Sequence, residues 1–280
     1  MRNFTFKGLL LTAVFMLLGC LSIQAANDDL ITKQITIKLE EAGTLPNKIA
    51  SSEMYKITNL KIIGEINGTD WNMIREMAGR DNRGYGTEGK LSVLDLSEAK
   101  IVKGGDSYYP GDNCYTSNDE IGEKAFTDCS RLTSLTLPVG ITSIGYDAFA
   151  YCSGLTSLTL PAGITSIGEF AFSYCSGLTS IYVYAEKVPR IGRYAFEGCA
   201  SRKCTLYVPK GTYDNYRRSE FGYFVNIVEF DATGIDKTTT STDVEEVSRY
   251  SVNGQRLAVP VKGLNIVKYS DGTARKVVVK

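Results

Sequence analysis

One short pattern, written four times between residues 121 and 208, constrains this chain more than any other feature. Each unit opens with Ile-Gly, continues with Ala-Phe and then reaches a Cys. The units begin at Ile121, Ile144, Ile167 and Ile191, so the steps are 23, 23 and 24 residues. Self-similarity at such a period predicts a solenoid, in which the units stack because none of them can bury its apolar face alone.

The strand of each unit follows its Cys. In the unit at residues 144–166 the sequence SLTL at 157–160 alternates leucine with small hydroxyl residues, which predicts a strand with leucines inward and hydroxyls outward. Pro161-Ala162-Gly163 then suits a tight turn. An LxxLxL strand at this period is the pattern of leucine-rich repeats. We therefore expect an α/β leucine-rich-repeat solenoid with 23-residue repeats and a parallel β-sheet on its concave face.

The opposite wall of each coil carries Ala-Phe and Cys at a spacing that suits one or two helical turns, so we expect short helical or 3-10 stubs there. Gly154 would end one such stub in a left-handed conformation. Stacking the units places equivalent residues over one another. The predicted structural core of the repeats is Phe126, Phe149, Phe172 and Phe196 with Cys129, Cys152, Cys175 and Cys199.

These units resemble the BspA-like leucine-rich repeats of bacterial surface proteins, whose unit reads much like IGxxAFxxCxxLTSLTLPxGITS. The resemblance extends over residues 35–230. It implies an exported adhesin class that engages host matrix proteins or other microbes. The last unit, CASRKCTLYVPKG, carries an extra residue, as expected of a terminal unit that covers an open edge.

Residues 1–26 have the features of a secretory signal peptide: Arg2 and Lys7, an apolar run at 9–18 and small residues at 25–26. Cleavage after Ala25 competes with a lipoprotein box ending at Cys20, which would make Cys20 a lipid anchor. Without the leader, 29 basic residues face 31 acidic ones, a formal charge of −2. This balance favours neither nucleic acid nor an anionic membrane as a partner.

The remaining chain divides by composition and pattern. We expect an N-terminal cap with a degenerate coil at 27–90, leucine-rich repeats at 91–211 with the regular units at 121–211, a C-terminal cap at 212–230 and a polar linker at 231–246. The cap should hold a short helix through Tyr213 and Tyr216, followed by a strand at 224–230.

Residues 247–280 have two hairpin turns, Asn253-Gly254 and Asp271-Gly272, which predict a small antiparallel β-module. The start YSVNGQR, the central KG and the basic final strand resemble the C-terminal sorting domains of the type IX secretion pathway. That resemblance implies an export address at the surface of a Gram-negative bacterium. The alternative is a small accessory domain.

The sequence offers little for catalysis. It contains no His, which excludes Ser-His-Asp and Cys-His catalysis and HExxH zinc sites. No phosphate-binding glycine motif occurs, and Asp106, Asp112 and Asp119 do not match a calcium loop. We expect no cofactor, no metal and no enzymatic activity, although a carboxylate-dependent glycoside hydrolase stays as a remote alternative.

Six cysteines would remain after removal of the leader. Four of them recur at one phase of the repeat, where a small buried group with a weak S–H donor fits better than a disulfide. We therefore favour buried thiols and leave the state of Cys114 open. Cys199 and Cys204 are the pair to test for a bridge.

The outward strand positions form the main candidate for ligand binding, which we call the concave strip: Ser134, Thr136, Ser157, Thr159, Ser180, Tyr182, Thr205 and Tyr207. Repeat solenoids often bind through this face, yet small hydroxyls also suit any curved sheet. A weaker candidate is the set of loop tyrosines Tyr85, Tyr108, Tyr109 and Tyr115, since tyrosine offers large contact area at low entropic cost.

These features predict a secreted or cell-surface protein, expected to be monomeric, that mediates protein–protein or cell adhesion. Its partner would be a host matrix protein, another cell-surface protein or a glycan, and a glycan-capture protein is the first alternative. Membrane contact would come only through a lipid anchor or surface attachment.

Overall fold

The computed structural model describes residues 30–109, 114–232, 246–251, 255–257, 261, 263–269 and 274–279. The expected leader with Cys20, most of the expected linker, Asp112 and both C-terminal hairpin turns lie outside these residues. The strands are β1 (Ile35–Lys38), β2 (Asn59–Ile66), β3 (Val93–Ile101), β4 (Gly104–Tyr109), β5 (Cys114–Thr116), β6 (Glu120–Ile121), β7 (Ser134–Thr136), β8 (Ser143–Ile144), β9 (Ser157–Leu160), β10 (Ser166–Ile167), β11 (Ser180–Val183), β12 (Arg190–Ile191), β13 (Thr205–Pro209), β14 (Asn226–Phe230), β15 (Glu246–Ser251), β16 (Arg256–Leu257), β17 (Gly263–Tyr269) and β18 (Ala274–Val279). The helices are α2 (Gly68–Met77) and α3 (Tyr213–Arg217), with 3-10 turns η1 (Leu45–Asn47) and η2 (Glu220–Tyr223).

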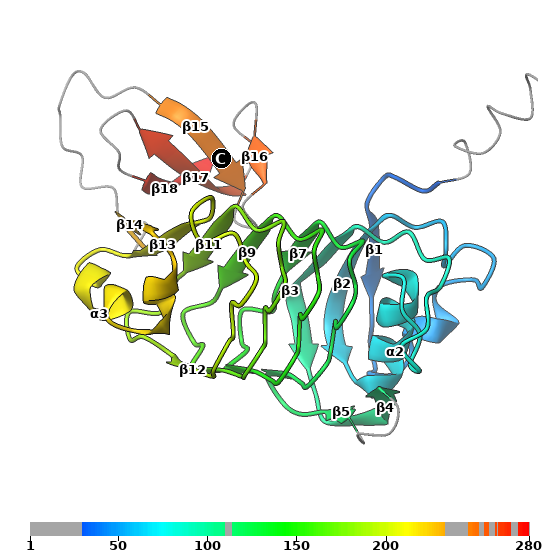
Figure 1. The fold of residues 1–280 in the computed structure, drawn as a ribbon. Coiled ribbons are helices and arrows are strands. Elements are labelled where there is room, and N and C mark those ends of the chain that lie inside the picture. The colour runs from blue at the N-terminus through cyan, green and yellow to red at the C-terminus, as the bar shows by residue number, and fades with distance from the viewer. Residues whose placement is uncertain are drawn as a thin grey trace, which may run out of the picture.

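A long parallel sheet organises the molecule, as the repeat pattern predicts (Figure 1). Its strands follow one another in the order β1, β2, β3, β7, β9, β11, β13, β14, and each neighbouring pair is parallel. Equivalent repeat positions pair across this sheet: Ser134 with Ser157, and Ser157 with Ser180. The expected N-terminal cap contributes β1 and β2 to the same sheet, so the solenoid begins well before the regular units.

A second, narrow sheet closes the other side of the coils. It consists of the two-residue strands β12, β10, β8 and β6 in that order, and each pair is parallel. Ile121, Ile144 and Ile167 point from these strands into the core and are buried. The isoleucine that opens each unit therefore packs against the leucines of the long sheet.

The expected helical stubs are wrong. The Ala-Phe segments are turns in which two residues of each coil adopt left-handed backbone conformations, for example Asp147 at φ 52° and Tyr151 at φ 61°. These turns direct backbone amides to the next coil: Phe149 N–H donates to the Ala171 carbonyl at 2.7 Å, and Tyr151 N–H donates to the Ser173 carbonyl at 2.8 Å. Backbone hydrogen bonds between coils take the place of the hydrogen bonds within a helix, because buried backbone N–H and C=O groups need a partner.

Gly154 also serves a different purpose from the one expected. It does not have a positive φ, and a Cβ on it would lie 2.2 Å from the carbonyl oxygen of Ser130 in the preceding coil. A glycine is therefore required here, because neighbouring coils approach so closely that no side chain would fit between them.

The phenylalanines form a continuous stack through the core, as predicted. Ring centroids of Phe126 and Phe149 are 5.3 Å apart, those of Phe149 and Phe172 are 5.0 Å apart, and those of Phe172 and Phe196 are 5.4 Å apart. The caps complete the stack: Trp71 of α2 lies 5.1 Å from Phe126, and Phe221 of η2 lies 5.4 Å from Phe196. Trp71 and Phe221 therefore cover the two end rings of the phenylalanine stack, Phe126 and Phe196.

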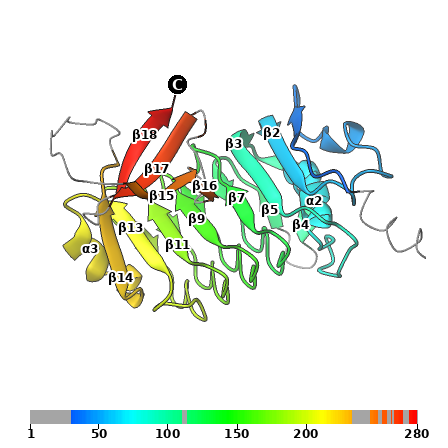
Figure 2. The ribbon, with the colours of Figure 1, turned by 90° about the horizontal axis from the view of Figure 1, so that it is seen from above.

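The C-terminal segment forms the predicted antiparallel module, in the order β18, β17, β15, β16. It is not separate from the solenoid, because β18 joins β14 through the pair Phe230 and Ala274 and extends the long sheet. Figures 1 and 2 both show the module at the β13–β14 end of the molecule, on the outward side of the long sheet. This position bears directly on the concave strip.

Candidate functional site: the outward face of the long sheet

Two rows of side chains run along the outward face of the long sheet. One row passes through Ser134, Ser157, Ser180 and Thr205. The other passes through Thr159, Tyr182 and Tyr207, and on the neighbouring strand Thr136 pairs with Asp95 of β3. The structure therefore brings the eight residues of the concave strip onto neighbouring strands of one sheet. Towards β1 the second row continues through Asp95, Lys61 and Thr36.

The tyrosine end of the concave strip is not exposed, which corrects the expectation of an open strip. Tyr182 is 1% exposed and Tyr207 is 6% exposed, and both belong to a buried apolar cluster with Phe230 of β14 and Ile266 of the module. Their rings stack with centroids 4.4 Å apart. The sequence of these strands alone could not predict this contact, because Ile266, which helps to cover the tyrosines, belongs to a module that follows the linker in the chain.

Serines beside the tyrosines are also buried. Ser180 Oγ donates a hydrogen bond to Ser157 Oγ at 3.0 Å, so these hydroxyls satisfy each other. Both serines are less than a tenth exposed. Burial raises the pKa of the Tyr182 phenol far above its usual value and raises that of Tyr184 to about 12. This half of the face is an occupied, apolar contact surface at neutral pH.

The other half of the outward face, on β1, β2, β3 and β7, lies beyond that cluster. Ser134 and Thr136 are half-buried, and Thr36 is exposed. Lys61 lies between two carboxylates, with Nζ 3.6 Å from Asp95 and 2.5 Å from Glu98. The hydrogen bond to Glu98 is the main cause of a raised Lys61 pKa, and the ammonium stays charged at neutral pH. This part is polar, with its charges already paired.

The loop tyrosines do not form one surface. Tyr85 and Tyr115 are well exposed, whereas Tyr109 is half-buried. Tyr108 is 1% exposed and its hydroxyl donates to the Glu123 carbonyl at 3.0 Å, so it is a core residue and not a recognition residue. Its ring packs 6.2 Å from Trp71, which explains why a loop that contains it folds against the cap.

The repeat cysteines are buried thiols with a common hydrogen bond. Cys152 Sγ donates to the Phe126 carbonyl at 3.0 Å, Cys175 Sγ to the Phe149 carbonyl at 3.1 Å, and Cys199 Sγ to the Phe172 carbonyl at 3.2 Å. Cys129, Cys199 and Cys204 are also free thiols, so Cys199 and Cys204 are not bridged. Burial raises the pKa of the Cys129 thiol to about 11 and that of Cys199 to about 12, which makes a nucleophilic thiolate at these positions costly.

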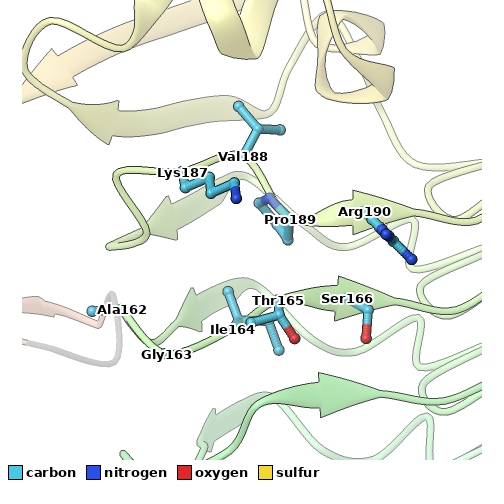
Figure 3. A pocket seen from close by; sticks show the side chains of 9 residues that line it. All are labelled: Ala162, Gly163, Ile164, Thr165, Ser166, Lys187, Val188, Pro189 and Arg190. Carbon is cyan, nitrogen blue, oxygen red and sulfur yellow. The ribbon is translucent and has the colours of Figure 1, made fainter.

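A cleft of about 450 Å³ separates two neighbouring coils (Figure 3). It is lined by Ala162, Gly163, Ile164, Thr165, Ser166, Lys187, Val188, Pro189 and Arg190. The unit that supplies Lys187 is one residue longer than the unit before it, and its loop departs from the proline turn of that unit. Lys187 and Arg190 are exposed, and the Thr165 hydroxyl already donates to the Thr142 carbonyl at 2.9 Å. The cleft thus offers two exposed cationic side chains, but no fixed set of hydrogen-bond donors that would orient a ligand.

One exposed feature was missed at the level of sequence. Rings of Tyr146, Tyr151, Tyr174 and Tyr194 project from the Ala-Phe turns and are 39%, 50%, 45% and 59% exposed. The signal that could have found them is the recurrence of an aromatic residue one or two positions before Ala-Phe, or directly before Cys, in successive units. The prediction of helical stubs did not include this feature, because it did not place these aromatic residues on a common face.

Two classes of site are not found in the described part of the chain. No group of three or more His, Cys, Asp or Glu residues is arranged to hold a metal ion there. Within the same residues, no helix has the length and apolar character needed to cross a bilayer.

The comparison with protein-family models agrees with the repeat pattern. The family model for the BspA type leucine-rich repeat region matches residues 113–221 in six copies. Among solved structures, the chain is similar to a leucine-rich repeat protein from Bacteroides ovatus, with 22% sequence identity and a TM-score of 0.34. That match covers 70% of this chain and 42% of the other, so this chain spans less than half of that protein's length. The comparison with curated proteins found no match.

Proposed function

We propose that this chain is a non-catalytic, exported leucine-rich-repeat protein that binds another protein through the outward face of its long sheet. The observation that carries the proposal is the pair of outward rows that run in register across the parallel strands. A regular surface of this kind is what repeat proteins use for extended contacts.

The contact between the outward face and the C-terminal module supports the proposal. The aromatic end of the face holds a β-module through Tyr182, Tyr207 and Ile266, so this face packs against a protein element already. Its remaining half, from Thr36 to Thr136, is polar and carries the paired charges Lys61, Asp95 and Glu98. A partner with complementary polar groups would contact that half, because rim-like polar surfaces give orientation and specificity.

Export and surface display belong to the same proposal. They rest on the leader pattern at residues 1–26 and on the resemblance of residues 247–280 to sorting domains. Adhesion to host matrix or to other cells is the biological setting that those two features suggest.

A binding experiment with the chain from residue 27 to 280 tests the proposal. It would be titrated against a panel of extracellular matrix proteins and soluble polysaccharides, next to the variants Thr136→Arg and Val139→Arg. Thr136 lies on the open half of the outward face, whereas Val139 is 75% exposed in the loop after the same strand. Both variants should melt as the parent does.

We expect saturable binding to at least one protein, weakened tenfold or more by Thr136→Arg, which is about 1.4 kcal/mol, and unchanged by Val139→Arg. Equal loss in both variants would move the site away from the outward face. Displacement of the bound protein by a soluble polysaccharide would favour glycan capture instead.

A further inference from the structure

A second surface lies on the turns opposite the long sheet, where aromatic rings gather without being part of the core. We call it the aromatic loop patch, formed by Tyr146, Tyr151, Phe170, Tyr174, Tyr194 and Tyr223. Tyr151 and Tyr174 stack at 4.9 Å, and Phe170 stacks on Tyr194 at 5.3 Å. Phe170 is half-buried, and the five tyrosines are between 39% and 59% exposed. Exposed rings that gather in stacks of this kind mark a contact surface more often than scattered single residues do.

Local backbone geometry makes these rings costly. Tyr151, Phe170, Tyr174 and Tyr194 have φ values of 61°, 56°, 56° and 58°, in the left-handed region that bulky residues avoid. The corresponding positions in other units carry residues that tolerate it better, such as Asp128 and Gly198. Stacking between rings recovers only part of the cost, at about 0.5–1.5 kcal/mol per pair. The rings are therefore poorly explained by folding alone.

One end of the patch is a pocket. It has a volume of about 170 Å³ and is lined by Ile191, Gly192, Tyr194, Ala195, Phe196, Glu197, Glu220 and Tyr223. Phe196 is 4% exposed, and the Tyr223 hydroxyl donates to the Cys199 carbonyl at 2.8 Å, which fixes that ring. Small-molecule sites measure about 300–1,000 Å³, so this pocket is the size of one long side chain.

The charges around the pocket indicate which kind of partner side chain it would bind. Among the turn residues 145–151, 168–174 and 192–198 together with 220–223, the acidic residues are Asp147, Glu169, Glu197 and Glu220, and the basic residue is Arg193. A second cation, Arg217, reaches the same segment, where its guanidinium donates to the Gly222 carbonyl at 3.2 Å. No salt bridge within the described residues involves Glu197 or Glu220, and both are exposed. Tyrosine rings attract cations through their faces, and a carboxylate pairs with a guanidinium through two parallel hydrogen bonds.

We propose that the aromatic loop patch binds a basic segment of a partner protein, with an arginine side chain of that segment seated between Tyr194, Tyr223, Glu197 and Glu220. Arginine suits the pocket better than lysine, because its planar group both stacks on tyrosine and forms paired hydrogen bonds. This surface is separate from the outward face of the long sheet, so either proposal can fail without the other.

A labelled hexa-arginine peptide is the probe, titrated into the chain from residue 27 to 280 and followed by fluorescence anisotropy. The test variant is Glu197→Gln with Glu220→Gln, and a second variant is Tyr194→Ser. The matched control is Glu41→Gln with Glu53→Gln, because these exposed carboxylates lie at the far end of the solenoid and their loss changes the net charge equally. Thermal melts check that each variant is folded.

We expect saturable binding of hexa-arginine that weakens at least tenfold in the Glu197 and Glu220 variant and in Tyr194→Ser, and changes less than twofold in the control. Hexa-lysine should bind several-fold more weakly. Equal weakening in the control would overturn the proposal in favour of general charge attraction. It would also be overturned if neither peptide binds saturably, or if a neutral hexasaccharide of glucose binds and Tyr194→Ser abolishes that binding.

Discussion

Docking of the C-terminal module on the concave strip should depend strongly on one side chain, Ile266. It is 1% exposed and shares a buried cluster with Tyr182, Tyr207 and Phe230. Ile266→Ala removes the side chain beyond Cβ, which at about 0.8 kcal/mol per buried carbon group gives roughly 2.4 kcal/mol. Any cavity left behind adds to that value. The equilibrium between docked and undocked module should then shift about 50-fold towards the undocked form.

Nitration by tetranitromethane, mapped to peptides by mass spectrometry, reports this shift directly. Tyr182 and Tyr207 are shielded in the docked form, so their nitration should accelerate in Ile266→Ala, whereas Tyr151, already exposed, should react at the parent rate. Val261→Ala is the control, because Val261 is 47% exposed in the same module and its truncation removes far less buried surface than that of Ile266.

Unchanged nitration of Tyr182 and Tyr207 in Ile266→Ala would refute the reasoning, since it would mean that Ile266 does not hold the module in place. A fall of the thermal melt of the whole chain by several degrees, with all tyrosines equally reactive, would also refute it. That result would make the module an integral part of the solenoid core and not a docked element.

Three further outcomes follow from the solenoid itself. Phe149→Ala should lower the free energy of unfolding by about 3–5 kcal/mol in urea titrations, because the ring is fully buried between two others, whereas Tyr151→Ala should cost far less. Gly154→Ala should cost about 1–3 kcal/mol in the same assay because its Cβ would meet a backbone oxygen, while Gly86→Ala, with open space around it, should stay within about 0.5 kcal/mol. Burial raises the pKa of the Cys175 thiol, so iodoacetamide at pH 8 should modify it only as fast as the chain unfolds, and rapid labelling of the native protein would contradict the buried ladder.

Most of the fold was predictable from the sequence because each unit repeats one packing problem. The leucine and isoleucine periodicity predicted the long parallel sheet, and the Ala-Phe pairs predicted the stack of rings from Phe126 to Phe196. The helical stubs were predicted wrongly, since an apolar pair followed by a Cys fits a helical turn and a non-helical turn equally well. What decides between them is the hydrogen bonding of each turn to the next coil, a contact between residues 22 apart such as Phe149 and Ala171, which local spacing does not encode.

The candidate site was predictable only in part, for a related reason. Alternation placed the eight outward residues correctly on neighbouring strands of one sheet, yet exposure depends on what else in the chain covers them. The covering residue Ile266 follows a linker, and nothing in its own segment indicates where the module docks. The prediction for Tyr108 was wrong for the same reason. The composition of its loop suggested recognition, but its ring packs near Trp71 and its hydroxyl donates to the Glu123 carbonyl, so it is a core residue.

Tyr182 and Tyr207 nevertheless carried a usable signal. They replace the small hydroxyl that Thr136 and Thr159 provide at the same position of earlier units, so they depart from the repeat on the one face that stacking of the coils does not fill. A tyrosine there adds a large apolar ring that must be covered either by a ligand or by the chain itself, because exposing it gains nothing for the fold. Since a tethered module is present at a high effective concentration, it competes effectively with a free partner for such a surface. A departure from the repeat on the outward face near a terminus, as at Tyr182 and Tyr207, therefore first predicts a contact within the chain itself.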